Sequence, residues 1–271
     1  MTMSEERQVH HVQSLERGLA VIAAFDAEHR ELTLTDVAER TDLSRSAVRR
    51  FLLTLTDLGY ARRNDRLFSL TPRVLDLGYA YLSSQALPEV ARPHLERLVA
   101  DIDESSSVSV MDGDDIVYIA RVATPRRIMT VRIGVGTRFP AVLTSMGRVI
   151  LADMLEDDLE AHLDRVELPK VTSQTVTDPV VLKARLEEGK KQGWIIVDQE
   201  LEEGLRSVAA PIHSSDGAVV AALNISTNAS RTPMEYLRST LIPRLLSAAA
   251  DIDADLGLTE RGSAGAPLEG S

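Results

Sequence analysis

Residues 33–70 constrain the fold of this chain more than any other stretch. Thr33 is a typical N-cap, and Asp36 places a carboxylate in the first turn of the short helix that follows. After a break, Ser44 caps a second helix, in which apolar residues recur at helical spacing: Val48, Phe51, Leu52, Leu55 and Leu58. This spacing predicts two helices joined by a tight turn, the second with one buried face.

The residues after the second helix predict a small hairpin. Gly59 suits the left-handed conformation in which helices commonly end. Segments 60–63 and 67–70 are short enough to be strands, and Asn64-Asp65 between them predicts a turn. A further helix is predicted from Gln13. Together these elements predict a winged helix-turn-helix.

Polar residues of this stretch predict contacts with DNA. Hydroxyl and guanidinium groups at the start and on the polar face of a helix suit phosphates and the base edges of the major groove. Between residues 44 and 66 there are six arginines and two aspartates, a local balance of +4. Each arginine alone is compatible with a solvated surface. In combination with the predicted fold they favour DNA binding by Thr33, Ser44, Arg45, Ser46, Arg49, Arg50, Arg62, Arg63 and Arg66.

The net charge of −11 is opposite to what DNA binding requires, but it is unevenly distributed. Residues 1–75 hold 11 basic and 11 acidic side chains, so residues 76–271 carry the whole excess. We expect that acidic part to be repelled by DNA while the first part binds it. The chain has no cysteine and no apolar run of about 20 residues, the length of a membrane helix. We therefore expect a soluble, cytoplasmic protein without disulfides.

The second part of the chain alternates helical and extended patterns and contains hairpins. This mixture predicts an α+β domain in which helices cover an antiparallel sheet. Residues 72–87 are predicted to form a linker helix with a joint at Leu87-Pro88, and residues 258–271 a disordered tail. The predicted strands are 107–111, 116–122, 128–133, 194–198, 207–213 and 219–227. The predicted helices are 90–102, 145–155, 179–192 and 234–256, the last interrupted or kinked at Pro243.

The sequence contains no arrangement that would run a reaction. The six histidines lack metal-ligand spacing, and the glycines at 134 and 136 lack the third glycine of a dinucleotide loop. Thr144-Ser145 instead leads into a helix start rich in small residues, whose N–H groups favour an anion, although the local sequence by itself favours an ordinary capped helix. We expect no enzymatic activity, no cofactor and no metal. Polar residues near apolar strands fit a ligand pocket or a core with satisfied serines: Asp198, Ser207, Asn224 and Ser226.

Residues from about 13 to 257 resemble the IclR-type bacterial transcriptional regulators. The motifs that carry the resemblance are SLERGLAVIAAF, LTLTDVAERTDLSRSAVRRFLLTLTDLGY, TSMGRVILA and DQELEEGLRSVAAPI. It implies a winged helix-turn-helix over residues 11–71, a linker helix over 72–87 and a GAF-like effector-binding domain over 88–257. It also implies dimers formed through the DNA-binding part, and often dimers of dimers.

Further motifs are similar to the branch of the family that governs β-ketoadipate, protocatechuate and 4-hydroxybenzoate catabolism: RRFLLTLTDLGY, LTPRVLDLGYAYLSS, GTRFPA and TSMGRV. The resemblance places the recognition helix at residues 44–58. It lines an effector pocket with Ile128, Val131, Ser145, Met146, Gly147, Asp198, Leu205, Ser207, Asn224 and Ser226. Ser145-Met146 stands where some members have Gly-Ala, so we expect a reshaped pocket that can pack on an aromatic ring.

These observations predict a sequence-specific regulator of an aromatic-catabolic operon. Its partners would be double-stranded operator DNA and a small carboxylic acid, either aromatic or a β-ketoadipate-like diacid. The carboxylate is expected near the N–H groups of residues 145–147. The alternatives are a regulator of an unrelated pathway with another effector, a small-acid enzyme with a helix-turn-helix appendage, and a protein-interaction module that binds no specific DNA.

Overall fold

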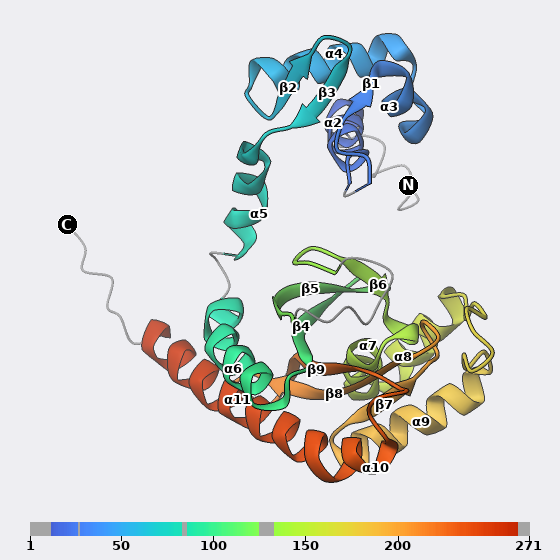
Figure 1. The fold of residues 1–271 in the computed structure, drawn as a ribbon, viewed down its shortest axis with the longest axis vertical. Helices are drawn as coiled ribbons and strands as arrows, with labels where there is room; N and C mark the ends of the chain where they lie inside the picture. Colours follow the sequence, from blue (N-terminus) through green and yellow to red (C-terminus); the bar gives the residue numbers. More distant parts are fainter. Residues whose placement is uncertain (1–11, 27, 83–85, 125–132, 265–271) are drawn as a thin grey trace, which may run out of the picture. The chain divides into compact units, whose positions relative to one another are not determined.

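The computed structural model describes residues 12–26, 28–82, 86–124 and 133–264. The chain divides into two compact units, residues 1–84 and 85–271, coloured from blue to teal and from green to red in Figure 1. Within the described ranges, no helix combines the length and the apolar character needed to cross a membrane.

The first unit is a winged helix-turn-helix, as predicted. Its elements in chain order are α2 (Gln13–Ala23), β1 (Leu32–Thr33), α3 (Leu34–Thr41), α4 (Arg45–Asp57), β2 (Ala61–Asn64), β3 (Leu67–Leu70), the 3₁₀ turn η1 (Pro72–Val74) and α5 (Leu75–Leu82). The three helices α2, α3 and α4 enclose a small core centred on Val21, Val37, Val48 and Leu52. The strand β3 pairs with β2 on one side and with β1 on the other, so the wing has a third strand that the sequence did not predict.

Both predicted N-caps form. The Thr33 hydroxyl accepts a hydrogen bond from the Asp36 amide at 3.3 Å, and the Asp36 carboxylate accepts one from the Thr33 amide at 2.8 Å. This reciprocal capping box satisfies two backbone donors at the start of α3. The Ser44 hydroxyl accepts from the Ala47 amide at 3.3 Å at the start of α4. The helix-turn-helix is therefore fixed largely by local hydrogen bonds.

The turn of the wing lies one residue later than predicted. Asn64 is still paired with Leu67 as the last residue of β2, so the two-residue turn is Asp65-Arg66 rather than Asn64-Asp65. Asp65 adopts φ 53°, a left-handed conformation that Asp tolerates better than most residues.

The second unit is an α+β domain with a six-stranded antiparallel sheet in the order β6-β5-β4-β9-β8-β7. Its helices are α6 (Ala86–Ile102), α7 (Ser145–Asp153), α8 (Glu156–Arg165), α9 (Pro179–Gln192), α10 (Met234–Tyr236) and α11 (Ile242–Ala264). Its strands are β4 (Ser105–Asp112), β5 (Asp115–Val122), β6 (Arg138–Pro140), β7 (Ile195–Asp198), β8 (Leu205–His213) and β9 (Val219–Asn228). The predicted fold class is confirmed, whereas α8 and β6 were not predicted.

The two faces of this sheet are covered by different helices. Helices α6 and α11 run side by side and pack on one face through residues such as Val208 and Leu223 (Figure 1). Helices α7 and α9 cover the other face, where Ala209 and Ala222 belong to a second core with Met146. Because strand side chains alternate, the same two strands serve both cores. We call the second surface the α7 face.

Several predicted boundaries differ from the structure. Leu87 and Pro88, predicted as the joint, lie in the first turn of α6, where a proline removes no intrahelical hydrogen bond. Helix α11 extends to Ala264 and so includes the first part of the tail predicted from residue 258, and residues 265–271 lie outside the described residues. A π-helical turn, Leu237–Leu241, separates α10 from α11 just before Pro243 and is the predicted interruption. The strand predicted at 128–133 lies almost wholly outside the described residues.

Gly147 allows α7 to approach the turn that precedes it. A Cβ atom on Gly147 would lie 2.3 Å from the carbonyl oxygen of Ala141 and 2.4 Å from its Cα. Both are backbone atoms, which cannot move aside as a flexible side chain would. The small residue in this motif is therefore a packing requirement of the α7 start.

We expect Gly147→Ala to lower the free energy of unfolding of the second unit by about 1–3 kcal/mol, since overpacking against backbone forces shifts. Trp194 is the only tryptophan and lies in this unit, so denaturant unfolding followed by its fluorescence measures the effect. Gly78→Ala in α5 is the matched control, because its Cβ would meet no atom within 4 Å. A Gly147→Ala midpoint equal to that of wild type would contradict this packing.

Candidate DNA interface and effector site

Four of the predicted DNA-contacting arginines line one groove of the first unit. Arg45 and Arg49 lie one turn apart on α4, and Arg63 and Arg66 belong to the wing. The groove has a volume of about 350 Å³, and its described lining includes no carboxylate. The Arg63 guanidinium lies 5.9 Å from the centre of the Phe68 ring, a cation–π contact that orients its charge. The groove is thus strongly basic.

The other predicted DNA-contacting residues lie elsewhere or are already engaged. Arg62 faces the opposite side of the wing from Arg63, because neighbouring strand residues alternate, and its Nε donates to Ser69 Oγ at 3.0 Å. Arg62 therefore does not line this groove, and its contact with DNA stays a prediction. Ser46 and Arg50 are exposed on α4 beside the groove but do not line it. The hydroxyls of Thr33 and Ser44 cap their helices.

In the second unit, the α7 face of the sheet carries a row of buried polar residues. Ser107 on β4 lies directly opposite Asn224 on β9, and Ser226 lies between Ser105 and Ser207 on the neighbouring strands. All of these side chains are buried. Asn224 Nδ2 donates to Ser226 Oγ at 3.0 Å, whereas Asn224 Oδ1 accepts no hydrogen bond from the part of the chain that the structure describes.

The start of α7 packs against this polar row. Ser145 and Met146 are almost completely buried, and Ser109 Oγ donates to Met146 Sδ at 3.3 Å. The Gly147 amide donates to the Thr144 hydroxyl at 3.0 Å, so the helix cap occupies one of the N–H groups predicted for a ligand. The amides of Ser145 and Met146 are the remaining first-turn donors. The structure thus brings Ser145 and Met146 together with the polar strand residues.

Asp198 does not join this group. It lies opposite Arg206 in the β7–β8 register, and its carboxylate accepts from Arg206 Nε and Nη2 at 2.9 and 2.8 Å. Since Ser207 follows Arg206, the two point to opposite faces, and Asp198 points away from the α7 face. The structure therefore does not bring Asp198 into the polar row, and its contact with an effector stays a prediction. Leu205 shares the face of Ser207 by alternation, and Ile128 and Val131 lie outside the described residues.

Tyr118 on β5 adds an aromatic side chain to the α7 face. It packs with Met146 in the core beneath α7, and its ring meets Phe139 edge-on with centroids 6.0 Å apart. Burial raises the pKa of Tyr118 to about 12, so its hydroxyl stays neutral at physiological pH. The α7 face therefore combines the apolar side chains of Tyr118, Phe139 and Met146 with the buried polar row.

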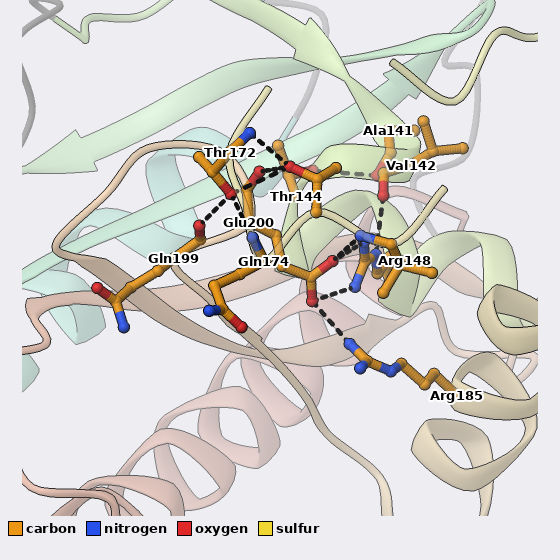
Figure 2. Close-up of polar contacts among 11 residues, drawn as sticks. Ala141, Val142, Thr144, Arg148, Thr172, Gln174, Arg185, Gln199 and Glu200 are labelled. Carbon is orange, nitrogen blue, oxygen red and sulfur yellow. Dashed lines mark hydrogen bonds and ion pairs between the residues drawn. The ribbon is translucent and has the colours of Figure 1, made fainter. Parts of the chain in front are cut away.

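Sequence reasoning missed a buried ion-pair cluster beside the start of α7 (Figure 2). Arg148 is fully buried and donates to both carboxylate oxygens of Glu200, at 2.9 and 2.7 Å, and to the Val142 carbonyl at 2.8 Å. Glu200 also accepts from Arg185 Nη1 at 2.8 Å and from the Val176 amide at 3.1 Å. The available signal was an arginine inside the apolar run MGRVILA.

Two threonines extend this cluster into the neighbouring loop. Thr175 Oγ1 donates to the Glu200 carbonyl at 2.7 Å, and Thr172 Oγ1 donates to the Gln199 carbonyl at 2.7 Å. The cluster thereby joins the α7 start, residues 172–176 and the turn after β7. Elsewhere in the described ranges, no group of three or more acidic or histidine side chains is arranged to hold a metal ion.

A basic groove on a winged helix-turn-helix, joined to a separate α+β unit with a buried polar face, defines a DNA-binding transcriptional regulator. Residues 14–65 match the IclR helix-turn-helix domain, and residues 79–254 match the family described as the bacterial transcriptional regulator IclR C-terminal domain. This chain belongs to the IclR family, whose members among its relatives are regulators rather than enzymes.

Named relatives agree with this assignment over nearly their whole length. The chain is 47% identical over 239 residues to the Pca regulon regulatory protein of Pseudomonas putida, covering 88% of this chain and 82% of that protein. It is 34% identical to the p-hydroxybenzoate hydroxylase transcriptional activator of Acinetobacter baylyi, covering 92% and 94%. An IclR homologue from Microbacterium hydrocarbonoxydans, solved with 4-hydroxybenzoate, superposes with a TM-score of 0.78 at 26% identity, covering 90% and 99%.

We expect Arg49→Ala to weaken binding to target DNA about tenfold and to reduce the dependence of the binding constant on salt by about one ion, because one cationic contact is removed. Arg62→Ala removes an arginine from the opposite side of the wing and is the matched control. Fluorescence anisotropy with duplex DNA at several salt concentrations measures both. Equal effects of the two substitutions would refute the groove as the DNA interface.

We expect Glu200→Gln to lower the free energy of unfolding by about 3–5 kcal/mol, because it leaves the Arg148 charge buried without a counterion. Arg185 is half exposed, so Arg185→Ala should cost less than about 1 kcal/mol. Denaturant unfolding followed by Trp194 fluorescence separates the two. If Glu200→Gln were as mild as Arg185→Ala, the buried pair would not hold the α7 start.

Proposed function

We propose that this chain is a cytoplasmic, sequence-specific regulator of an operon for aromatic-compound catabolism of the β-ketoadipate type, controlled by a small carboxylic acid. The names of the two relatives support the pathway, and the 4-hydroxybenzoate bound to the Microbacterium homologue supports the class of ligand. The observation that carries the ligand site is Asn224, which is 3% exposed and has a buried oxygen without a hydrogen-bond partner in the described chain.

The proposed DNA contacts follow the basic groove. Arg45 and Arg49 would enter the major groove from α4, while Arg63 and Arg66 would contact the backbone or an adjacent groove. Ser46 and Arg50, exposed on the neighbouring stripe of α4, extend this surface. The ligand is double-stranded operator DNA.

We propose that the protein binds DNA as a homodimer, with a dimer of dimers as a further step. Helix α2 carries an apolar stripe at helical spacing, in which Val12, Leu15 and Leu19 are 60%, 62% and 53% exposed. Leu75 and Leu77 on α5 are also exposed. Apolar stripes of this kind are commonly covered by a partner, and a second copy would supply the second half-site contact.

The proposed effector site is the contact region between the α7 start and the polar row of the sheet, where a ligand would have to displace side chains such as Met146. Its proposed lining is Ser145, Met146, Leu205, Ser207, Asn224 and Ser226. Met146 narrows this space and offers a polarisable sulfur to an aromatic ring. Control of DNA binding requires that the acid bind two states of the protein with different affinity, and this difference sets the size of the response.

We expect a thermal-shift screen of aromatic acids and β-ketoadipate-type diacids to contain at least one acid that raises the melting temperature, because binding to the folded state adds stability by mass action. Asn224→Leu removes the buried acceptor and should weaken that acid at least tenfold, about 1.4 kcal/mol. Asn64→Leu, the same change in the wing, should leave its binding unchanged.

The screen also tests the proposed pathway. A panel in which no acid shifts the melting temperature would withdraw the aromatic-catabolic assignment. An acid that binds wild type and Asn224→Leu equally would move the site away from the polar row. Operator binding measured with and without the acid then shows whether it controls the protein.

A further inference from the structure

A β-bulge in β5 changes the direction of a charged side chain. Val108 on β4 lies opposite Ala120, whereas the next residue, Ser109, lies opposite Tyr118, so Ile119 is an extra residue in β5. Ile119 and Ala120 both belong to the core beneath α6 and α11. In a regular strand, residues three apart point to opposite faces; here Tyr118 and Arg121 share the α7 face. Bulges often re-aim side chains beside functional sites.

Arg121 thereby joins the polar row described above. It lies opposite Ser107 in the register, and its Nη1 donates to Ser107 Oγ at 2.9 Å. Ser107 is completely buried and lies opposite Asn224 on its other side. Arg121, Ser107 and Asn224 therefore form one line across β5, β4 and β9, on the face where α7 begins.

The charge of Arg121 is half-buried, and the polar contact described for it is a neutral hydroxyl. Four other arginines of this unit illustrate the paired state: Arg138 with Asp112 and Asp115, Arg148 with Glu200, Arg165 with Asp114, and Arg206 with Asp198. The adjoining residues 125–132 include no Asp or Glu that could serve. Within the described chain, no carboxylate lies within ion-pair distance of Arg121.

The pKa of Arg121 is therefore shifted in the opposite direction from the pKa of a paired arginine. Burial lowers the pKa of Arg121, whereas the hydrogen bond that Arg138 donates to Asp112 raises the pKa of Arg138. Keeping a desolvated guanidinium without a counterion costs free energy, and an anion with two oxygens in one plane matches its donor geometry. A carboxylate is such an anion.

We propose that Arg121 binds the carboxylate of the acid effector and is the residue that selects an acid over a neutral molecule of the same shape. This inference rests on the proposed function, and it assigns the charge recognition to β5 rather than to the N–H groups of the α7 start alone. Asn224 Oδ1 then accepts a hydrogen bond from a hydroxyl of the same molecule, while Tyr118 and Met146 supply apolar contacts. The ligand class is a hydroxylated aromatic carboxylate.

The test uses calorimetry of the full chain with the screened acid that binds wild type most tightly and with its neutral amide. Wild type should bind the acid at least 30-fold more tightly than the amide. In Arg121→Gln this ratio should fall to near one, mainly through weaker acid binding, and Arg121→Lys should retain part of the preference because it keeps the charge without the planar fork. Arg138→Gln removes an exposed, paired arginine of the same sheet and should keep the wild-type ratio.

The acid-to-amide ratio separates recognition of charge from a structural effect, because a merely loosened site would weaken both ligands together. An unchanged ratio in Arg121→Gln overturns the assignment of Arg121 and leaves the acid-responsive regulator standing. A wild-type protein that binds acid and amide equally overturns it without any variant. If no acid binds wild type, both the acid effector and the role of Arg121 are withdrawn.

Discussion

The buried pair of Arg148 and Glu200 is the interaction on which the geometry of the second unit depends. A fully buried guanidinium has to use its donors within the protein, and Arg148 does so through Glu200 and the Val142 carbonyl. Glu200 in turn accepts from the Val176 amide, so three segments distant in sequence share one charge network. Such pairs add little net stability compared with apolar packing, but they penalise every arrangement that separates the partners. Ser145 and Met146 lie in the same first turn of α7 as this anchor, so the pair helps to fix their position.

The sheet below this anchor supports two different environments on its two faces. Val108, Val208 and Leu223 point into an apolar core beneath α6 and α11, while their neighbours Ser107, Ser109 and Asn224 point to the α7 face. Strand β4 is rich in serine, which is unusual for a buried strand because each buried hydroxyl needs a hydrogen-bond partner. The Ser106 hydroxyl donates to the backbone carbonyl of Asn224. In the Asn224 side chain, Oδ1 accepts no hydrogen bond from the described chain. The polar groups are therefore concentrated on the face that a ligand would meet.

Features that depend on residues close together in the sequence were predicted, whereas features that depend on residues far apart in the sequence were not. The helix-turn-helix, its caps and its wing were predicted because Thr33, Ser44 and Gly59 act on neighbours a few residues away. The pairing of Asp198 with Arg206 was not predicted, because it is fixed by the register of two strands, which sequence periodicity does not reveal. The sequence analysis also did not separate Arg62 from Arg63, although adjacent residues of a strand point to opposite faces. Arg121 was overlooked because the bulge at Ile119, and not the alternation pattern, decides its direction.

The charge distribution links these local features to the two tasks of the protein. The second unit holds 19 basic and 29 acidic side chains, a balance of −10, so it repels DNA, and it repels an anionic effector for the same reason. An acid can therefore bind in this unit only where the local charge is positive. Arg121 supplies a local positive charge, and no carboxylate of the described chain lies within ion-pair distance of it. The groove of the first unit uses the same device, a concentrated set of guanidinium groups without carboxylates. If both proposed sites are correct, geometry separates the two kinds of anion: an open groove would admit a DNA duplex, whereas a half-buried arginine in line with Ser107 and the buried Asn224 would admit only a small acid.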